Sequence, residues 1–225
     1  LALLAEEARV RALLAPHGDS AAVAAVNGPD NVVVSGLAAR IADVARAAHA
    51  AGIESRPLSV SHAFHSPLVE PMLREFEQHA RAIRPKTVAT ALVSNLSGAL
   101  VRDTAALDAS YWRRHAREPV RFADACRALY MHGARVFVEI GPAPVLVGMA
   151  RSTVTEPDAK WLASMRRGED PRVRMLASLG ALFVAGAKPQ FARLGSLRRG
   201  RHVALPSYPF QRKRFWLPAA APSAA

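Results

Sequence analysis

Two apolar runs on either side of a turn sequence constrain the first part of this chain most strongly. Residues 21–26 (AAVAAV) and 32–35 (VVVS) are apolar, and the second run is rich in β-branched valine. The stretch NGPDN between them consists of residue types that are typical of tight turns. The pattern therefore predicts a β-hairpin.

Helical periodicity flanks this hairpin on both sides. Before it, four apolar residues fall on one helical face, with Glu7 as one polar interruption: Leu3, Val10, Leu13 and Leu14. We expect the chain to begin in the middle of this helix, without a cap, and therefore inside a larger fold. After the hairpin, residues 37–48 have helical spacing and residues 55–60 have strand composition. The order helix, strand, strand, helix, strand predicts a ferredoxin-like small subdomain over residues 1–61.

The middle of the chain alternates between helix and strand. Ser66 and Pro67 open a predicted helix, and Pro71 moves its regular part to start near that residue, because proline lacks the amide for a helical bond. Strands are predicted at residues 90–94 and 136–140. A helix between them has one apolar side, formed by Phe122, Cys126 and Leu129. This alternation indicates an α/β layer over residues 62–160.

The last part of the chain, residues 161–225, gives few periodic signals. One helix is expected within it, at residues 173–185. The remainder is basic, aromatic and rich in proline, and it ends in the low-complexity stretch AAAPSAA.

Composition excludes several classes of function. The single cysteine rules out an internal disulfide and a CxxC metal site. No stretch approaches the roughly 18 apolar residues of a membrane span, and charged residues stand where a signal peptide is apolar. We therefore expect a cytoplasmic protein without membrane contact. The net charge of +12 suggests nucleic-acid binding, but the basic residues are scattered and no recognition motif accompanies them, so we expect no nucleic-acid partner.

The stretch HAFHSP brings His62 and His65 together, and three interpretations compete. A metal site is disfavoured, because no HExxH motif or nearby cysteine supplies further ligands, and we assign no metal. A structural role in the turn is the second interpretation. The third is catalysis: histidine titrates near neutral pH, so His65 can take a proton from a hydroxyl and give it to a leaving thiol.

Five motifs follow one another along the chain: VNGPDNVVVSG (26–36), HAFHSPLVEPM (62–72), VSNLSG (93–98), YWRRHAREPVRF (111–122) and FVEIGPAPVL (137–146). Together they resemble the acyltransferase domains of modular polyketide synthases, within the family of malonyl-CoA:acyl carrier protein transacylases. The resemblance covers nearly the whole chain. It implies an α/β fold: an incomplete acyltransferase fold with a ferredoxin-like small subdomain and the C-terminal part of an α/β-hydrolase-like large subdomain. It also implies that residues 161–225 are the linker that follows such a domain.

The resemblance also implies roles for individual residues. His65, directly before Ser-Pro, matches the base that activates a serine of a GHSxG elbow. The family's orienting backbone carbonyl corresponds to His132. Asn27 and Asn95 match turns beside the substrate cleft, although both also stabilise turns by local bonding. Malonyl-CoA is the implied substrate, the phosphopantetheine thiol of an acyl carrier protein is the acceptor, and no permanently bound cofactor is expected.

The residues before His65 carry a further implication about the substrate. HAFH resembles the form of the extender-unit motif that accompanies malonyl units, whereas YASH accompanies methylmalonyl units. His62, Ala63 and Phe64 are therefore the expected selectivity residues, with Phe64 crowding the position of an added methyl group. One methyl group is worth about 1–3 kcal/mol in a pocket, so we expect leaky selectivity. Core packing is the alternative role of Phe64.

The nucleophile of this chemistry is not found in the sequence. No GxSxG motif occurs in the 225 residues, so the nucleophilic serine is expected outside this chain, and the chain alone is expected to be inactive. Two hypotheses follow. The chain is part of a malonyl-transferring acyltransferase, with an acyl carrier protein as partner. Alternatively it is an inactive scaffold or docking fragment, whose LPSYPFQRKRFWLP stretch (205–218) contacts the adjacent ketosynthase.

Overall fold

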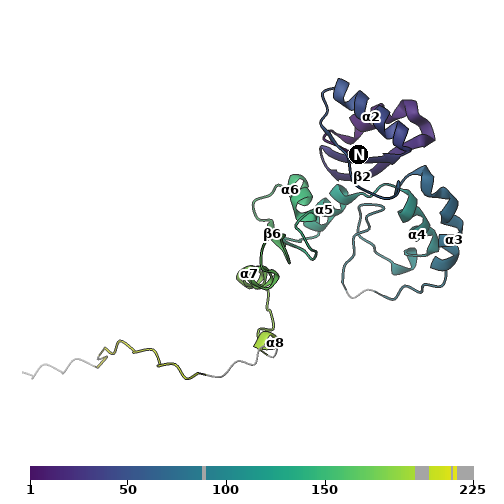
Figure 1. Cartoon of the computed structure of the whole chain (residues 1–225). Coiled ribbons are helices and arrows are strands. Elements are labelled where there is room, and N and C mark those ends of the chain that lie inside the picture. The colour runs from purple at the N-terminus through teal and green to yellow at the C-terminus, as the bar shows by residue number, and fades with distance from the viewer. Residues whose placement is uncertain (88–89, 196–202, 214, 217–225) are drawn as a thin grey trace, which may run out of the picture. The chain divides into compact units, whose positions relative to one another are not determined.

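The structure is a computed structural model that describes residues 1–87, 90–195, 203–213 and 215–216 (Figure 1). The chain forms two compact units, Leu1–Ala187 and Lys188–Ala225. The first unit contains both β-sheets, and the second contains the short helix α8 (Ala192–Gly195). The division falls after the boundary that the sequence predicted at residue 160.

Residues 1–56 form a four-stranded sheet that packs against two helices. The strand order is β2-β3-β1-β4, and every neighbouring pair is antiparallel. The element order βαββαβ is that of the ferredoxin-like split βαβ arrangement, and it confirms the predicted hairpin and the helix after it. The elements are β1 (Ala2–Leu3), α1 (Glu7–Leu14), η1 (Ala15–Ser20), β2 (Ala21–Gly28), β3 (Asn31–Gly36), α2 (Ala38–Ala50) and β4 (Ser55–Arg56).

The prediction that the chain begins within a helix is wrong, because its first residues form β1. Ala2 pairs with Val33 of β3 on one side and with Arg56 of β4 on the other. Leu3 is completely buried. Pairing of the backbone on both sides and burial of Leu3 together override the helical spacing of the sequence. The helix starts only at Glu7.

One apolar core between the sheet and the two helices holds this small subdomain together. Val10 of α1, Val32 of β3 and Val44 of α2 are completely buried in it. Burial of a side chain of this size contributes about 1.5–3 kcal/mol. Ile53, shortly before β4, is buried in the same core, and β4 pairs with β1 before the histidine-bearing loop departs.

Residues 57–121, called the histidine segment below, contain that loop and two helices that lie side by side, α3 and α4 (Figure 1). As predicted, the regular helix begins beside Pro71, which lies in the first turn of α3. The predicted strand at residues 90–94 is wrong, because within this range only Val93 forms a bridge, to Leu100 across a turn. The elements are η2 (Pro67–Val69), α3 (Glu70–Ala80), η3 (Thr104–Ala106) and α4 (Ala109–Arg117).

A second, two-stranded sheet follows. Its strands are parallel and are joined through a helix, and Phe137 stacks on Trp161 across them with 4.5 Å between ring centroids. The buried Ser178 of α7 donates a hydrogen bond to the carbonyl of Ala163 at 2.7 Å, which ties the predicted linker helix to this sheet. The elements are α5 (Phe122–Met131), β5 (Val136–Glu139), α6 (Leu146–Thr153), β6 (Lys160–Ala163) and α7 (Pro171–Val184).

The described helices give no indication of a membrane span, since none of them is both long enough and apolar enough to cross a bilayer.

Candidate active site

His65 lies in a tight turn with an uncommon backbone conformation. Its φ of 55° places it in the left-handed region, the one non-glycine residue of the described chain with positive φ. Histidine adopts this region more readily than most residues, yet the conformation still costs about 1–2 kcal/mol. Ser66, which is completely buried, holds the turn. Its hydroxyl donates to the carbonyl of Ala63 at 2.6 Å and accepts from the amide of Leu68 at 3.2 Å.

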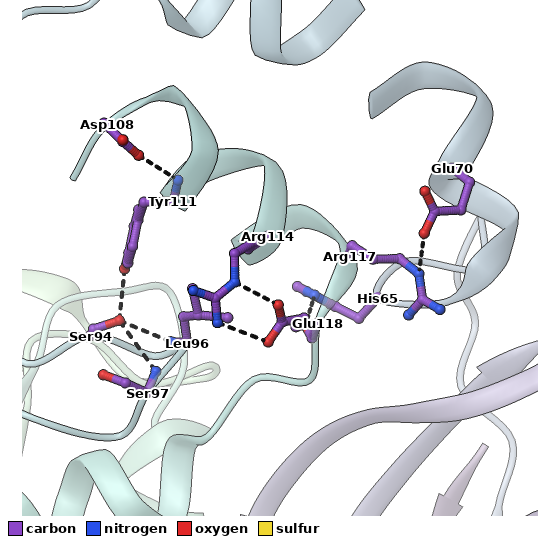
Figure 2. Close-up of polar contacts among 10 residues, drawn as sticks. All are labelled: His65, Glu70, Ser94, Leu96, Ser97, Asp108, Tyr111, Arg114, Arg117 and Glu118. Atoms are coloured by element: carbon purple, nitrogen blue, oxygen red, sulfur yellow. Dashed lines mark hydrogen bonds and ion pairs between the residues drawn. The ribbon is translucent and has the colours of Figure 1, made fainter. Parts of the chain in front are cut away.

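The ring of His65 is oriented by a backbone carbonyl. Nδ1 lies 2.9 Å from the carbonyl oxygen of Glu118 (Figure 2). Because a carbonyl oxygen can only accept, Nδ1 carries the hydrogen and donates. In the neutral ring Nε2 is therefore the unprotonated nitrogen, which is the state that a general base requires.

The position of the Glu118 carbonyl follows from the local sequence. Glu118 precedes Pro119, and a residue before proline is driven out of the helical region. Glu118 accordingly ends α4 with ψ of 160°, so that its carbonyl turns away from the helix. Val120 then pairs with β2: its amide donates to Ala24 and its carbonyl accepts from Val26 at 2.8 Å. His65 and the carbonyl that it contacts are thus both attached to the small subdomain.

The assignment of the orienting carbonyl to His132 is wrong. His132 caps the C-terminus of α5, and its amide donates to the carbonyl of Ala128, while the contact to His65 comes from Glu118. The sequence did contain a signal for the true acceptor, since the Glu-Pro pair at the end of YWRRHAREPVRF marks an extended residue directly after a helix.

Ion pairs join the helix that follows His65 to the helix that precedes Glu118. Arg117 of α4 donates to Glu70 of α3 at 2.8 Å (Figure 2). Arg113 lies 3.8 Å from Glu70 and 3.6 Å from Glu77. Partly exposed pairs of this kind contribute about 0.2–1 kcal/mol each. Their role is to fix the spacing of the two helices.

A cavity of about 720 Å³ opens beside His65. His62, Ala63, Phe64 and His65 line one side of it, and apolar residues of β3 and α2 line the other. The Phe64 side chain is 55% exposed, and its ring centroid lies 5.8 Å from that of His62. The sequence-predicted selectivity residues therefore share one cavity with the predicted base.

Asn27 and Asn95 are not among the residues that line this cavity. Asn27 belongs to β2 rather than to a turn. Asn95 lies in a turn, where its carbonyl accepts from the amide of Arg121 at 2.7 Å. For Asn95 the observed contact is a structural backbone hydrogen bond to a residue far along the chain.

A second histidine beside His65 was missed by the sequence reasoning. The ring centroid of His115, on α4, lies 6.3 Å from that of His65, with the planes at 73°. Burial lowers the pKa of His115 below its ordinary value, and the charge of His65 lowers it further. The only signal in the sequence was its helical spacing, three residues before Glu118, which predicts that both occupy the same side of α4.

Two other chemistries find no support at this site. Among the described residues, no three His, Cys, Asp or Glu side chains are grouped closely enough to hold a metal ion. Cys126 is buried on α5, and burial raises its pKa to about 11. Its thiol stays protonated at neutral pH, which makes it a poor nucleophile.

The fold and the carbonyl-oriented histidine of the histidine segment are accompanied by a match to one protein family. The sequence model of the acyl transferase domain family matches residues 2–189, and the chain belongs to that family.

More particular relatives are polyketide synthases. The chain is 43% identical over 225 residues to polyketide synthase GfsB of Streptomyces halstedii, covering 98% of this chain and 4% of that protein. It is 38% identical over 216 residues to the phenolphthiocerol synthesis polyketide synthase Pks15/1 of Mycobacterium bovis, covering 96% of this chain and 10% of that protein. The chain thus spans a small part of these synthases.

Solved structures agree with this family. The acyltransferase domain from the second module of the salinomycin polyketide synthase superposes with a TM-score of 0.84 and 39% identity. The match covers 93% of this chain and 49% of that domain. FabD from Acinetobacter baumannii, at 22% identity and a TM-score of 0.71, shares the fold. The chain therefore spans about half of the solved domains that it matches.

Proposed function

We propose that this chain supplies the general base of a polyketide synthase acyltransferase that moves a malonyl unit from coenzyme A to an acyl carrier protein. The observation that carries the proposal is the 2.9 Å contact between Nδ1 of His65 and the Glu118 carbonyl. This contact keeps Nε2 unprotonated in the neutral ring and holds its direction. The serine nucleophile comes from polypeptide outside the 225 residues.

In the proposed reaction, Nε2 of His65 accepts the proton of the serine hydroxyl as the serine oxygen bonds to the thioester carbon of malonyl-CoA. The carbon–sulfur bond breaks, and the proton passes from Nε2 to the departing sulfur of coenzyme A. The phosphopantetheine thiol then gives its proton to Nε2 and attacks the acyl-serine. The serine oxygen leaves and recovers the proton. No permanently bound cofactor takes part.

The preference for malonyl units is proposed to come from Phe64. Its ring stands in the cavity wall next to His65, where a smaller side chain would leave room for a methyl group on the acyl α-carbon. We expect Phe64→Ser to raise the ratio of methylmalonyl to malonyl transfer about tenfold, in competition between the two CoA esters. Phe76→Ser is a matched control, because Phe76 lies on α3 outside the cavity lining. An unchanged ratio in Phe64→Ser would rule out the steric explanation.

Acyl carrier protein is the proposed partner at the active site, and the adjacent ketosynthase is the proposed partner of the C-terminal unit. In that unit, aromatic side chains of the described tail are largely exposed: Tyr208 by 66%, Phe210 by 75% and Trp216 by 80%. Exposed aromatic residues close together are typical of protein interfaces. Arg214, Leu217 and Pro218 of the same predicted stretch lie outside the described residues.

The test of the proposed function is labelling of an acyltransferase that contains this chain together with a serine-elbow segment. Radiolabelled malonyl-CoA should label the wild type, and His65→Ala should lower the rate of acyl-enzyme formation by about 10²–10⁴-fold. His79→Ala is the control, because His79 is an exposed histidine of α3 outside the cavity lining, and it should retain near wild-type labelling. The 225-residue chain alone should not be labelled. Equal labelling of wild type and His65→Ala would remove the base assignment and favour the inactive scaffold or docking fragment.

A further inference from the structure

The ring of His115 is held in place by aromatic contacts on α4. Its centroid lies 5.9 Å from that of Tyr111 and 5.8 Å from that of Trp112. The Tyr111 hydroxyl is 2.8 Å from the buried Ser94 hydroxyl, which itself accepts bonds from the amides of Leu96 and Ser97 (Figure 2). His115 therefore stands against His65 on a supported aromatic surface.

The other charged groups around this histidine pair are engaged with partners of opposite charge. The Glu118 carboxylate accepts from Arg114 at 2.8 Å. On the facing side of α3, Glu70 pairs with Arg117, and Glu77 pairs with Arg113 and Arg81. Within the described residues, the two imidazoles are the groups of this cluster that change charge near neutral pH. When one ring becomes charged, its effect on the pKa of the other ring is therefore not masked by a charge change of another group in this cluster.

We propose that His115 is a positioning residue for His65, a ring that restrains the base edge-on so that, once His65 takes up a proton, the pair carries a single positive charge. This inference rests on the proposed function for its catalytic meaning, because His65 gains its proton when the serine oxygen attacks. A neutral His115 adds no repulsion at that moment. Burial and the neighbouring charge both lower the pKa of His115, so protonation of His115 in addition to His65 is disfavoured.

The coupling can be measured in the 225-residue chain without any transfer reaction, by NMR titration of the histidine ring carbons. His65→Asn removes the charge and keeps a residue that tolerates positive φ. We expect the titration midpoint of His115 to rise by about 0.3–1 pH unit in this variant, from the Coulomb energy of two charges 6–7 Å apart in a partly screened site. The control is His62→Asn, at the exposed end of the same loop, and in this variant the titration midpoint of His115 should stay unchanged. An unchanged His115 midpoint in His65→Asn would overturn the proposal.

A reciprocal variant keeps the test decisive if His65→Asn fails to fold. His115→Lys places a lasting positive charge at the same point on α4, and the titration midpoint of His65 should fall. His115→Gln, neutral and similar in size, should leave that midpoint nearly unchanged but broaden the ring signals, because the restraint by the edge-on ring is lost. Identical His65 curves in His115→Lys and His115→Gln would contradict the charge coupling. The titration results are independent of the labelling experiment. If His65→Ala loses acyl transfer but the two rings show no charge coupling, His65 remains the proposed base and only the role of His115 is rejected.

Discussion

The small subdomain and the histidine segment are held together in different ways. The small subdomain encloses one apolar core of completely buried residues from its sheet and both helices. In the histidine segment, α3 buries only Leu73 and Ala80, and α4, which is described in full, buries no side chain completely. Polar contacts take over there: the buried hydroxyls of Ser66 and Ser94, the Glu118 carbonyl, and the α3–α4 ion pairs.

This difference separates stability from positioning. Apolar burial is non-directional and large, so it determines whether the subdomain folds. Hydrogen bonds and ion pairs contribute less net free energy but fix directions, which is what a proton-transferring ring requires. Substitutions in the small subdomain should therefore change the free energy of unfolding, whereas those in the histidine segment should change the geometry of His65 at smaller energetic cost.

The largest expected effect comes from the core. Leu3→Ala removes a completely buried side chain from β1, between two strands, and should lower the free energy of unfolding by about 2–5 kcal/mol. Urea denaturation followed by circular dichroism measures it. Leu4→Ala is the matched control, since Leu4 is 38% exposed. Equal midpoints for the two variants would mean that β1 is not part of the core.

Ser66→Ala is expected to have an intermediate effect. It removes both hydrogen bonds of a buried hydroxyl and should destabilise the chain by about 1–2 kcal/mol. It should also speed amide exchange in the loop around His65, which loses the contact that fixes its turn. Ser61→Ala, at an exposed position of the same loop, should stay within about 0.5 kcal/mol of wild type. A loop that exchanges at the wild-type rate in Ser66→Ala would show that the turn is fixed by other contacts.

Side-chain patterns in the sequence predicted the hairpin, α2 and the beginning of α3, whereas only the resemblance to acyltransferases implied that His62, Phe64 and His65 share one site. These patterns failed where backbone contacts, rather than side chains, determine the structure. β1 has two residues and exists because β3 and β4 lie on either side of it. Glu118 contacts His65 through its backbone carbonyl and not through its side chain, so the only sequence signal for this contact was Pro119, which follows it.

The first compact unit continues past residue 160 for a related reason. β6 has four residues, and its sequence KWLA gives no clear alternation. Its place is fixed by parallel pairing with β5 and by the hydrogen bond from Ser178. Both partners are distant in sequence, so tertiary contacts rather than local preference decide where the compact unit ends.

A smaller effect is expected from the ion pair between the two helices of the histidine segment. A double-mutant cycle with Glu70→Gln and Arg117→Gln should give a coupling energy of about 0.2–1 kcal/mol, because both groups are partly exposed. The coupling should shrink in high salt, where exposed pairs are screened. A coupling above this range that does not depend on salt would show that the histidine segment relies on this pair for its stability.

The smallest expected effect is a pH dependence of stability that originates in His115. In the folded chain its pKa lies below the ordinary value of 6.5, so between these two values the unfolded chain binds more protons. The free energy of unfolding should therefore fall as the pH drops below 6.5 toward the lowered pKa, and this contribution should be constant above 6.5. His115→Gln should flatten that part of the curve in urea denaturations at several pH values, while His79→Gln, at an exposed position of α3, should not. Parallel stability curves against pH for wild type and His115→Gln would mean that His115 is as well solvated in the folded chain as in the unfolded chain. The supported aromatic surface would then not restrain the His115 ring.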